Sequence, residues 1–140
     1  MTRSDLRLGM VGLGALGLPM AVNLQRAGYP LRVHTRSRGP ENDPSLQGCT
    51  PTSTPAEAAR GVDALLICVS DDAAVETVLF GRDGAASTLA PGACVVDCST
   101  ISPEAAIAAA ERLTVRRVQD AVRRAVDDAL VARAEAGQAR

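Results

Sequence analysis

The feature that most constrains this fold is a short apolar run that ends in closely spaced glycines. The run suits a buried parallel strand and consists of Leu6, Leu8, Met10 and Val11. Three glycines follow at G-x-G-x-x-G spacing, namely Gly12, Gly14 and Gly17. From Ala15 onward, apolar residues recur at helical intervals as far as Gly28: Leu16, Met20, Leu24 and Ala27. This order predicts a strand, a tight turn and a helix that ends near Gly28.

Each glycine in the turn answers a separate physical need. Gly12 lets the chain turn sharply, Gly14 lets the backbone approach a pyrophosphate, and Gly17 lets the helix pack closely on its strand. The free N–H groups at the start of the helix then face an anion. In this strand-turn-helix context the spacing predicts dinucleotide binding, and the alternative is a structural turn without a ligand. The predicted contacts in this turn are Gly12, Leu13, Gly14, Ala15, Leu16 and Gly17.

Length and composition limit the classes of protein that remain. A chain of 140 residues is expected to form one domain with a real core. The net charge is −1 and the aromatic residues are Tyr29 and Phe80, which favours neither disorder nor a stacking surface for nucleic acid. All 15 basic residues are arginine, so these residues offer no lysine for acid/base or Schiff-base chemistry.

The cysteines and the N-terminus bear on the cellular compartment. The four cysteines form neither a C-x-x-C pair nor a cluster with histidine, so no zinc or dithiol motif is predicted. Buried free thiols in a reducing cytoplasm fit best. Arg3 and Arg7 before an apolar stretch mimic a secretory signal, but the glycines and Pro19 inside that stretch argue against one. No stretch is long and apolar enough to span a membrane, and a cytoplasmic protein is expected.

A second strand, over Leu31 to Val33, is expected to end at the cofactor's adenosine ribose. The segment that follows offers no acid before Glu41 to accept a bond from a 2′-hydroxyl; it presents Arg36 and Arg38. Arginine's planar fork suits a 2′-phosphate, which favours NADP over NAD, although a solvated loop is the alternative. The sole histidine, His34, is interpreted as a packing or surface residue.

The middle of the chain predicts a loop, a short helix and a buried strand. Residues 39–54 are predicted as a loop with a very short strand near Cys49. Thr54 is predicted to cap a helix to about Arg60, with Pro55 at its first position and Glu57 completing a capping box. Residues 62–69 suit a central parallel strand whose end faces ligands. Asp71 or Asp72 is predicted to cap a helix over 73–79, and cofactor contact by Val69 and Ser70 stays open.

A third unit repeats this plan after a turn at residues 81–84 and a short helical segment at 85–89. Residues 93–97 are predicted as a strand that delivers Cys98, Ser99 and Thr100 to the same sheet edge, and Ser102 and Pro103 open a helix to about Arg112. The hydroxyls of Ser99 and Thr100 either orient a carboxylate or carboxamide or complete local turns. The alternation of strands and helices predicts an α/β fold: a doubly wound, mostly parallel sheet with helices on both faces.

The sequence contains four motifs in this order: G-L-G-A-L-G-L-P-M-A-x-N-L, T-R-S, C-V-S-D-D-A-A-V and V-D-C-S-T-I-S-P-E. Together they resemble the N-terminal Rossmann domain of the β-hydroxyacid dehydrogenases. That family includes 3-hydroxyisobutyrate dehydrogenase and the 6-phosphogluconate dehydrogenase cofactor domain, and imine reductases share its design.

The resemblance covers about residues 6–112. It implies that residues 12–17 hold pyrophosphate, that Arg36 meets the ribose or its phosphate, and that Thr100 lies beside the nicotinamide. It also implies that Val69 and Ser70 line the path of the cofactor. We predict further cofactor contacts at Thr35, Ser37 and Asp71. Thr35 replaces the asparagine that is usual before that arginine.

The resemblance weakens after Arg112. Gln119-Asp120-Ala121 matches only the start of the D-A-P-V-S-G-G substrate motif, and no catalytic lysine follows. We therefore expect an NADP-binding domain at 1–112, a tail at 113–140 and a gene truncated by a frameshift after Ala121. A small hydroxyacid would be a substrate only with the missing domain supplied. The alternatives are a non-catalytic nucleotide-binding or sensory module, an imine-reductase-like fragment and an inert product. No catalytic or metal-binding residue is assigned.

The tail has an apolar pattern of its own. Valines and a leucine recur at helical spacing, which predicts a helix from about Thr114 to Ala136: Val115, Val118, Val122, Val126 and Leu130. This stripe either packs on the domain or pairs with another copy of the chain. Because acids balance the arginines of the tail, a nucleic-acid partner is not expected.

Overall fold

The fold is built on one parallel sheet, and the loops that carry the predicted site residues lie at the carboxyl ends of its strands. The computed structural model describes residues 5–37 and 39–138, and the side chains of residues 116–125, 127–129 and 138 lie outside that description. The sheet has five strands in the order β3-β2-β1-β4-β5, and every pairing is parallel. The strands are β1 (Leu8–Val11), β2 (Leu31–His34), β3 (Thr50–Pro51), β4 (Ala64–Ile67) and β5 (Cys94–Asp97).

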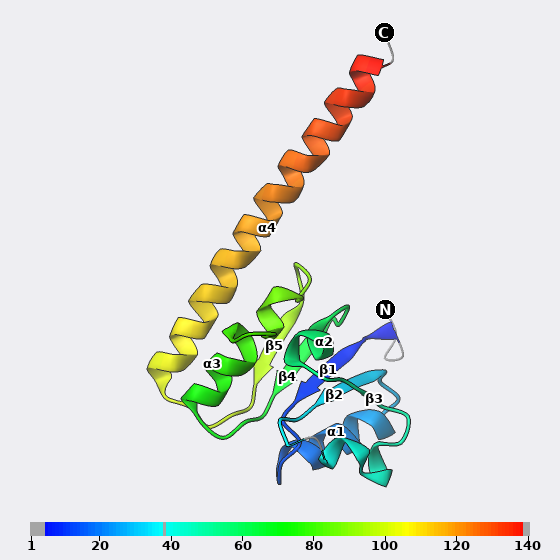
Figure 1. Cartoon of the computed structure of the whole chain (residues 1–140), viewed down its shortest axis with the longest axis vertical. Helices are drawn as coiled ribbons and strands as arrows, with labels where there is room; N and C mark the ends of the chain where they lie inside the picture. Colours follow the sequence, from blue (N-terminus) through cyan, green and yellow to red (C-terminus); the bar gives the residue numbers. More distant parts are fainter. Residues whose placement is uncertain (1–4, 38, 139–140) are drawn as a thin grey trace.

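Helices cover both faces of this sheet (Figure 1). One face carries α1 (Gly17–Arg26), and the other carries α2 (Pro55–Ala59) and α3 (Asp72–Phe80). Three short 3₁₀ segments lie in the connections: η2 (Pro40–Asn42), η3 (Pro44–Leu46) and η4 (Ala85–Ser87). The longest element is α4 (Pro103–Gln138). The predicted doubly wound α/β fold is confirmed.

Two apolar cores hold the layers together, one on each face of the sheet. On the α1 side, Met10 and Val33 are completely buried and pack with Leu13, Ala21 and Leu46. On the α2 and α3 side, Leu65 and Ile67 are completely buried and pack with a second set: Val11, Ala58, Ala59, Val75 and Leu79. Because strands β1 and β4 supply apolar side chains to both faces, they occupy the centre of the sheet, as expected for buried parallel strands.

The predicted helix caps are present, with two differences in detail. The Thr54 hydroxyl accepts from Glu57 N at 3.1 Å, but the Glu57 carboxylate accepts from Ser53 N at 2.7 Å instead of from the cap residue. At α3, Asp71 is the cap, since its carboxylate accepts from Ala74 N at 2.8 Å. Asp72 lies in the first turn and instead accepts from Ser102 N and the Ser102 hydroxyl, at 2.8 and 2.7 Å.

The predicted break between two C-terminal helices is wrong, because α4 is one helix of 36 residues. Residues 104–136 contain neither glycine nor proline and are rich in alanine, so nothing in the backbone ends the helix near Leu113. Residues 115–119 are helical, as predicted for the tail. In Figure 1 the first turns of α4 lie beside α3, and its far end projects away from the sheet.

Some predicted burial is also wrong. Leu16 is 59% exposed although it belongs to the apolar repeat of α1, and Cys94 is exposed rather than buried. Both residues lie at ends or edges of elements, where neighbours cover only one side. Arg3 and Arg38 lie outside the described residues, and the side chains of Val118 and Val122 do so as well. In the described part of the chain, none of the helices combines the length and apolarity that crossing a membrane requires.

Candidate dinucleotide site

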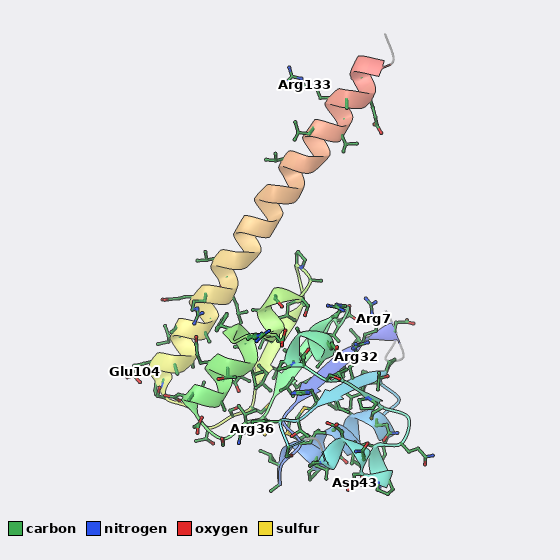
Figure 2. The ribbon with its side chains drawn as sticks, in the orientation of Figure 1. Arg7, Arg32, Arg36, Asp43, Glu104 and Arg133 are labelled. Carbon is green, nitrogen blue, oxygen red and sulfur yellow. The ribbon has the colours of Figure 1, made fainter. Side chains whose placement is uncertain are left out.

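A cleft of about 850 Å³ lies at the carboxyl ends of the strands. Its walls come from the loops after β1, β2, β4 and β5 and from the near side of α3. In an open parallel sheet this edge is where ligands bind. Figure 2 shows Arg36 at this edge, while Arg7 lies at the opposite end of the sheet.

The glycine turn forms the floor of the cleft. Gly12 has φ +99°, and a Cβ there would lie 2.0 Å from the Cys68 carbonyl oxygen, so this position requires glycine. A Cβ on Gly17 would lie 1.9 Å from the Gly12 carbonyl oxygen, so the helix packs on the turn itself. A Cβ on Gly14 would meet no protein atom within 4 Å. The fold therefore explains Gly12 and Gly17 but does not require Gly14.

The end of β2 contributes two buried residues, His34 and Thr35, and two exposed ones. His34 is buried, its carbonyl oxygen accepts from Gly12 N at 2.9 Å, and its Nδ1 lies 3.0 Å from the Thr52 carbonyl oxygen. His34 thus holds the glycine turn against β2, in agreement with its interpretation as a packing residue. Beyond it, Arg36 and Ser37 line the cleft with exposed side chains.

The loops after β4 and β5 are joined by a hydroxyl. The Ser99 Oγ accepts from Val69 N at 2.9 Å, and Ser99 N donates to the Asp97 carboxylate at 2.9 Å. The Ser99 hydroxyl therefore joins two loops that are 30 residues apart in sequence, a role that was not predicted from the sequence. Thr100 lies in the cleft wall and is exposed.

The structure brings every residue predicted for the cofactor into this one cleft. The residues that line it include Gly12, Leu13, Gly14, Ala15, Leu16, Gly17, Thr35, Arg36, Ser37, Val69, Ser70, Asp71 and Thr100. Leu16, exposed as noted above, faces this opening instead of the core. The proximity is a property of the fold, since these residues come from four separate loops.

Comparison with known proteins identifies the family. The model of the NAD-binding domain of 6-phosphogluconate dehydrogenase matches residues 7–126. The chain belongs to this family. It is the NAD(P)-binding domain of a hydroxyacid dehydrogenase-like oxidoreductase, in agreement with the resemblance drawn from its motifs.

Individual relatives share the domain and extend beyond it. The 2-hydroxy-3-oxopropionate reductase of Escherichia coli (strain K12) is 41% identical over 99 residues, which cover 70% of this chain and 33% of the relative. The structure of 3-hydroxyisobutyrate dehydrogenase from Salmonella typhimurium superposes with a TM-score of 0.74 at 34% identity, covering 81% and 39% of the two chains. Psf3, solved with NADP+ and 2-OPP, gives 0.67 at 32% identity, covering 80% and 38%. The chain spans about a third of the length of these relatives.

Charge in the cleft of this NAD(P)-binding domain is mostly positive. Arg36 and Arg82 both line the cleft, and neither guanidinium makes a hydrogen bond or ion pair with the residues that the structure describes. The carboxylate in the lining is Asp71, which is already engaged as the cap of α3. The cleft therefore offers two uncompensated cations to a ligand.

Sequence reasoning missed the wall that α3 provides. Arg82, just beyond the helix, and a set of residues on one helix face line the cleft: Ala73, Ala74, Thr77 and Val78. Their spacing of three and four residues was a usable signal, because such residues share a face. Pro55 and Cys68 were missed as well. Cys98 was predicted to reach this sheet edge but was not assigned to the site.

Proposed function

We propose that the cleft binds NADP(H) and prefers it to NAD(H). The observation that carries the proposal concerns the described part of the chain: Arg36 and Arg82 line the cleft without a hydrogen bond or ion pair, and the carboxylate of the lining, Asp71, already caps α3. A ribose 2′-hydroxyl is usually bound by a free acid at this place, whereas a 2′-phosphate is bound by arginine. The NADP+ complex of the relative Psf3 supports the same choice.

The residues present fit such a ligand. In our proposal the turn from Gly12 to Gly17 holds the pyrophosphate, which Gly14 admits because its Cα faces open space. Leu16 precedes α1 without any side-chain cap. Leu18 N donates to the Gly14 carbonyl oxygen at 3.0 Å and Pro19 has no N–H, so in the first turn of α1 the N–H of Gly17 is the one offered to an anion. When bound, the dinucleotide would supply hydride chemistry at its nicotinamide ring.

The other predicted residues take positions along the dinucleotide. Arg36 binds the 2′-phosphate, with Thr35 and Ser37 beside the adenosine ribose. Val69, Ser70 and Asp71 line the path of the cofactor, and Thr100 lies at the nicotinamide end. This order follows the cleft wall from the end of β2 to the end of β5.

Titration calorimetry with NADPH and NADH tests the proposal. We expect NADPH to bind more tightly, and Arg36→Ala to weaken NADPH about 10- to 100-fold through the loss of a charge-assisted contact, with little effect on NADH. Arg60→Ala is the matched control, because Arg60 is exposed and lies outside the cleft lining. Equal losses for both cofactors would overturn the 2′-phosphate assignment, and absence of binding would overturn the cofactor site.

The reaction proposed for the complete enzyme is hydride transfer between NADP(H) and a small β-hydroxyacid or its semialdehyde. Residues 1–112 would form the cofactor half and residues 113–140 a tail, in a cytoplasmic protein. The 140 residues contain no lysine to supply the proton. We therefore expect this chain to bind NADPH without turning over hydroxyisobutyrate, glycerate or gluconate-type substrates. Measurable turnover of any of these substrates would contradict the proposal that this chain supplies the cofactor half alone.

We further propose that the tail pairs with a second copy of the chain. Val115, Val126 and Leu130 are 56%, 51% and 60% exposed. Their spacings of 11 and 4 residues place them on one face of α4, since 11 residues make about three turns. An exposed apolar stripe on a projecting helix is typical of a helix that associates with another helix.

A further inference from the structure

The topology brings two cysteines that are 30 residues apart in sequence to neighbouring positions. Strands β4 and β5 pair in parallel up to Ile67 opposite Asp97. The ladder continues by one bond, because Cys98 N donates to the Ile67 carbonyl oxygen at 2.7 Å. Cys68 and Cys98 are the next residue on each strand, so they lie side by side at the carboxyl end of the sheet.

The two side chains belong to the same face of the sheet. Cys68 packs with Leu66 against the core on the α1 side, and Leu66 is in register with Val96. Since side chains alternate along a strand, Cys98 shares the side of Val96 and therefore that of Cys68. Burial raises the pKa of the Cys68 thiol, and the nearby Cys98 and Asp97 raise it further. The thiols thus lie within electrostatic reach of each other.

This spacing is compatible with a disulfide. Neighbouring strands lie about 4.8 Å apart, within the range of about 4.4–6.8 Å that Cα atoms of disulfide-bonded cysteines span. Both thiols are partly exposed and line the dinucleotide cleft, so small molecules reach them. The other two cysteines, Cys49 and Cys94, lie outside the cleft lining.

We propose that Cys68 and Cys98 form a redox-active dithiol that a low-molecular-weight disulfide oxidises to an intramolecular disulfide. One protein thiolate attacks the small disulfide, forms a mixed disulfide and releases one small thiolate. The second protein thiolate attacks the protein sulfur of that bond and releases the other small thiolate. The protein loses two protons and two electrons, and the small disulfide is reduced to two thiols.

Oxidation should weaken dinucleotide binding. The cysteines immediately precede the two loops that Val69 N and the Ser99 hydroxyl join at 2.9 Å. A disulfide fixes these strand ends to each other and turns two separate side chains of the lining into one rigid bridge, which changes the shape of the cleft beside Ser70 and Thr100. This second part rests on the proposed function, whereas formation of the disulfide does not.

The full chain carrying Cys49→Ser and Cys94→Ser tests the dithiol without competing thiols. After exposure to glutathione disulfide we expect its mass to fall by two hydrogen atoms, with a Cys68–Cys98 cross-link in the peptide map. The reaction should accelerate as the pH rises above neutrality, because the thiolate reacts and the pKa of Cys68 is raised. The matched Cys68→Ser and Cys98→Ser chain should yield no internal disulfide. If the first variant takes up only glutathione adducts, the dithiol proposal is overturned.

Cofactor affinity of the same variant tests the consequence. We expect NADPH to bind at least fivefold more weakly to the oxidised than to the reduced form, and bound NADPH to slow the oxidation. Equal affinities would overturn the effect on binding and leave the disulfide established by mass. If neither form bound NADPH, the proposed function would fail, while the mass measurement would still decide the dithiol.

Discussion

At the scale of single residues, the glycines of the turn differ in what requires them: the fold requires Gly17, whereas a bound ligand would require Gly14. A methyl group on Gly17 would collide with the Gly12 carbonyl oxygen, whereas one on Gly14 would project into open cleft. Packing of the fold therefore explains the glycine at position 17 but gives no reason for the glycine at position 14. A bound pyrophosphate would give that reason.

Two substitutions test this distinction. Gly14→Ala should leave the melting temperature nearly unchanged and weaken NADPH at least tenfold, because its methyl group occupies ligand space. Gly17→Ala should destabilise the fold by about 1–3 kcal/mol, as overpacking generally does. Thermal unfolding and calorimetry measure the two effects. Full NADPH affinity in folded Gly14→Ala would argue against pyrophosphate at this turn.

Arg82 gives a second prediction at this scale. It is exposed, follows α3 and lines the cleft, whereas the 2′-phosphate is proposed to bind at Arg36 after β2, so we expect the charge of Arg82 to act at longer range. Arg82→Ala should weaken NADPH about fivefold or less, since exposed charge pairs contribute little, and should leave NADH unchanged. An equal loss for NADH would indicate instead that Arg82 contacts the part that both cofactors share.

At the scale of elements, α4 is attached to the sheet domain through α3. Asp72 accepts two hydrogen bonds from Ser102, just before α4. One turn further along α3, Glu76 pairs with Arg112 of α4 at 2.6 Å. The Arg112 guanidinium also lies 3.7 Å from the centre of the Phe80 ring. These contacts fix the first turns of α4, while the remainder extends beyond them (Figure 1).

The contact at Asp72 predicts a dependence of stability on pH. Hydrogen bonds from the Ser102 side chain, then from its backbone, lower the pKa of Asp72 below its ordinary value of 3.8. The contribution is complete above that value and is lost as the pH falls through the lower folded pKa. Between pH 5 and pH 2 the wild type should therefore lose more melting temperature than Asp72→Asn. Parallel curves for the two proteins would show that this contact does not contribute. Asp43 and Asp63, whose pKa values are also lowered, are present in both and cancel.

At the scale of the whole molecule, the projecting part of α4 has too few contacts to be stabilised by the domain. Residues 130–137 are all exposed, and isolated helices gain little stability without packing. Pairing with a second copy would cover Val126 and Leu130. Light scattering should then give a dimer for the wild type and a monomer for Val126→Glu with Leu130→Glu. Ala132→Glu, at an exposed position on the opposite side of the helix from the stripe, should remain dimeric; a monomeric wild type at micromolar concentration would refute the pairing.

The sequence by itself determined the strand-turn-helix at the N-terminus, the alternation of strands and helices, and the residues of the four loops. These features follow from local rules, since glycine spacing, caps and apolar periodicity act within a few residues. The sequence did not determine the length of α4, because it predicted one helix to about Arg112 and another from about Thr114 to Ala136, and no local rule showed that the two continue as one.

Only the tertiary structure decided which residues meet. The register of β4 against β5 places Cys68 beside Cys98, and the packing of α3 brings Arg82 to the cleft that Arg36 lines. The physical reason is that contacts between distant segments depend on strand order and register, which arise from burial of the whole sheet rather than from any one segment.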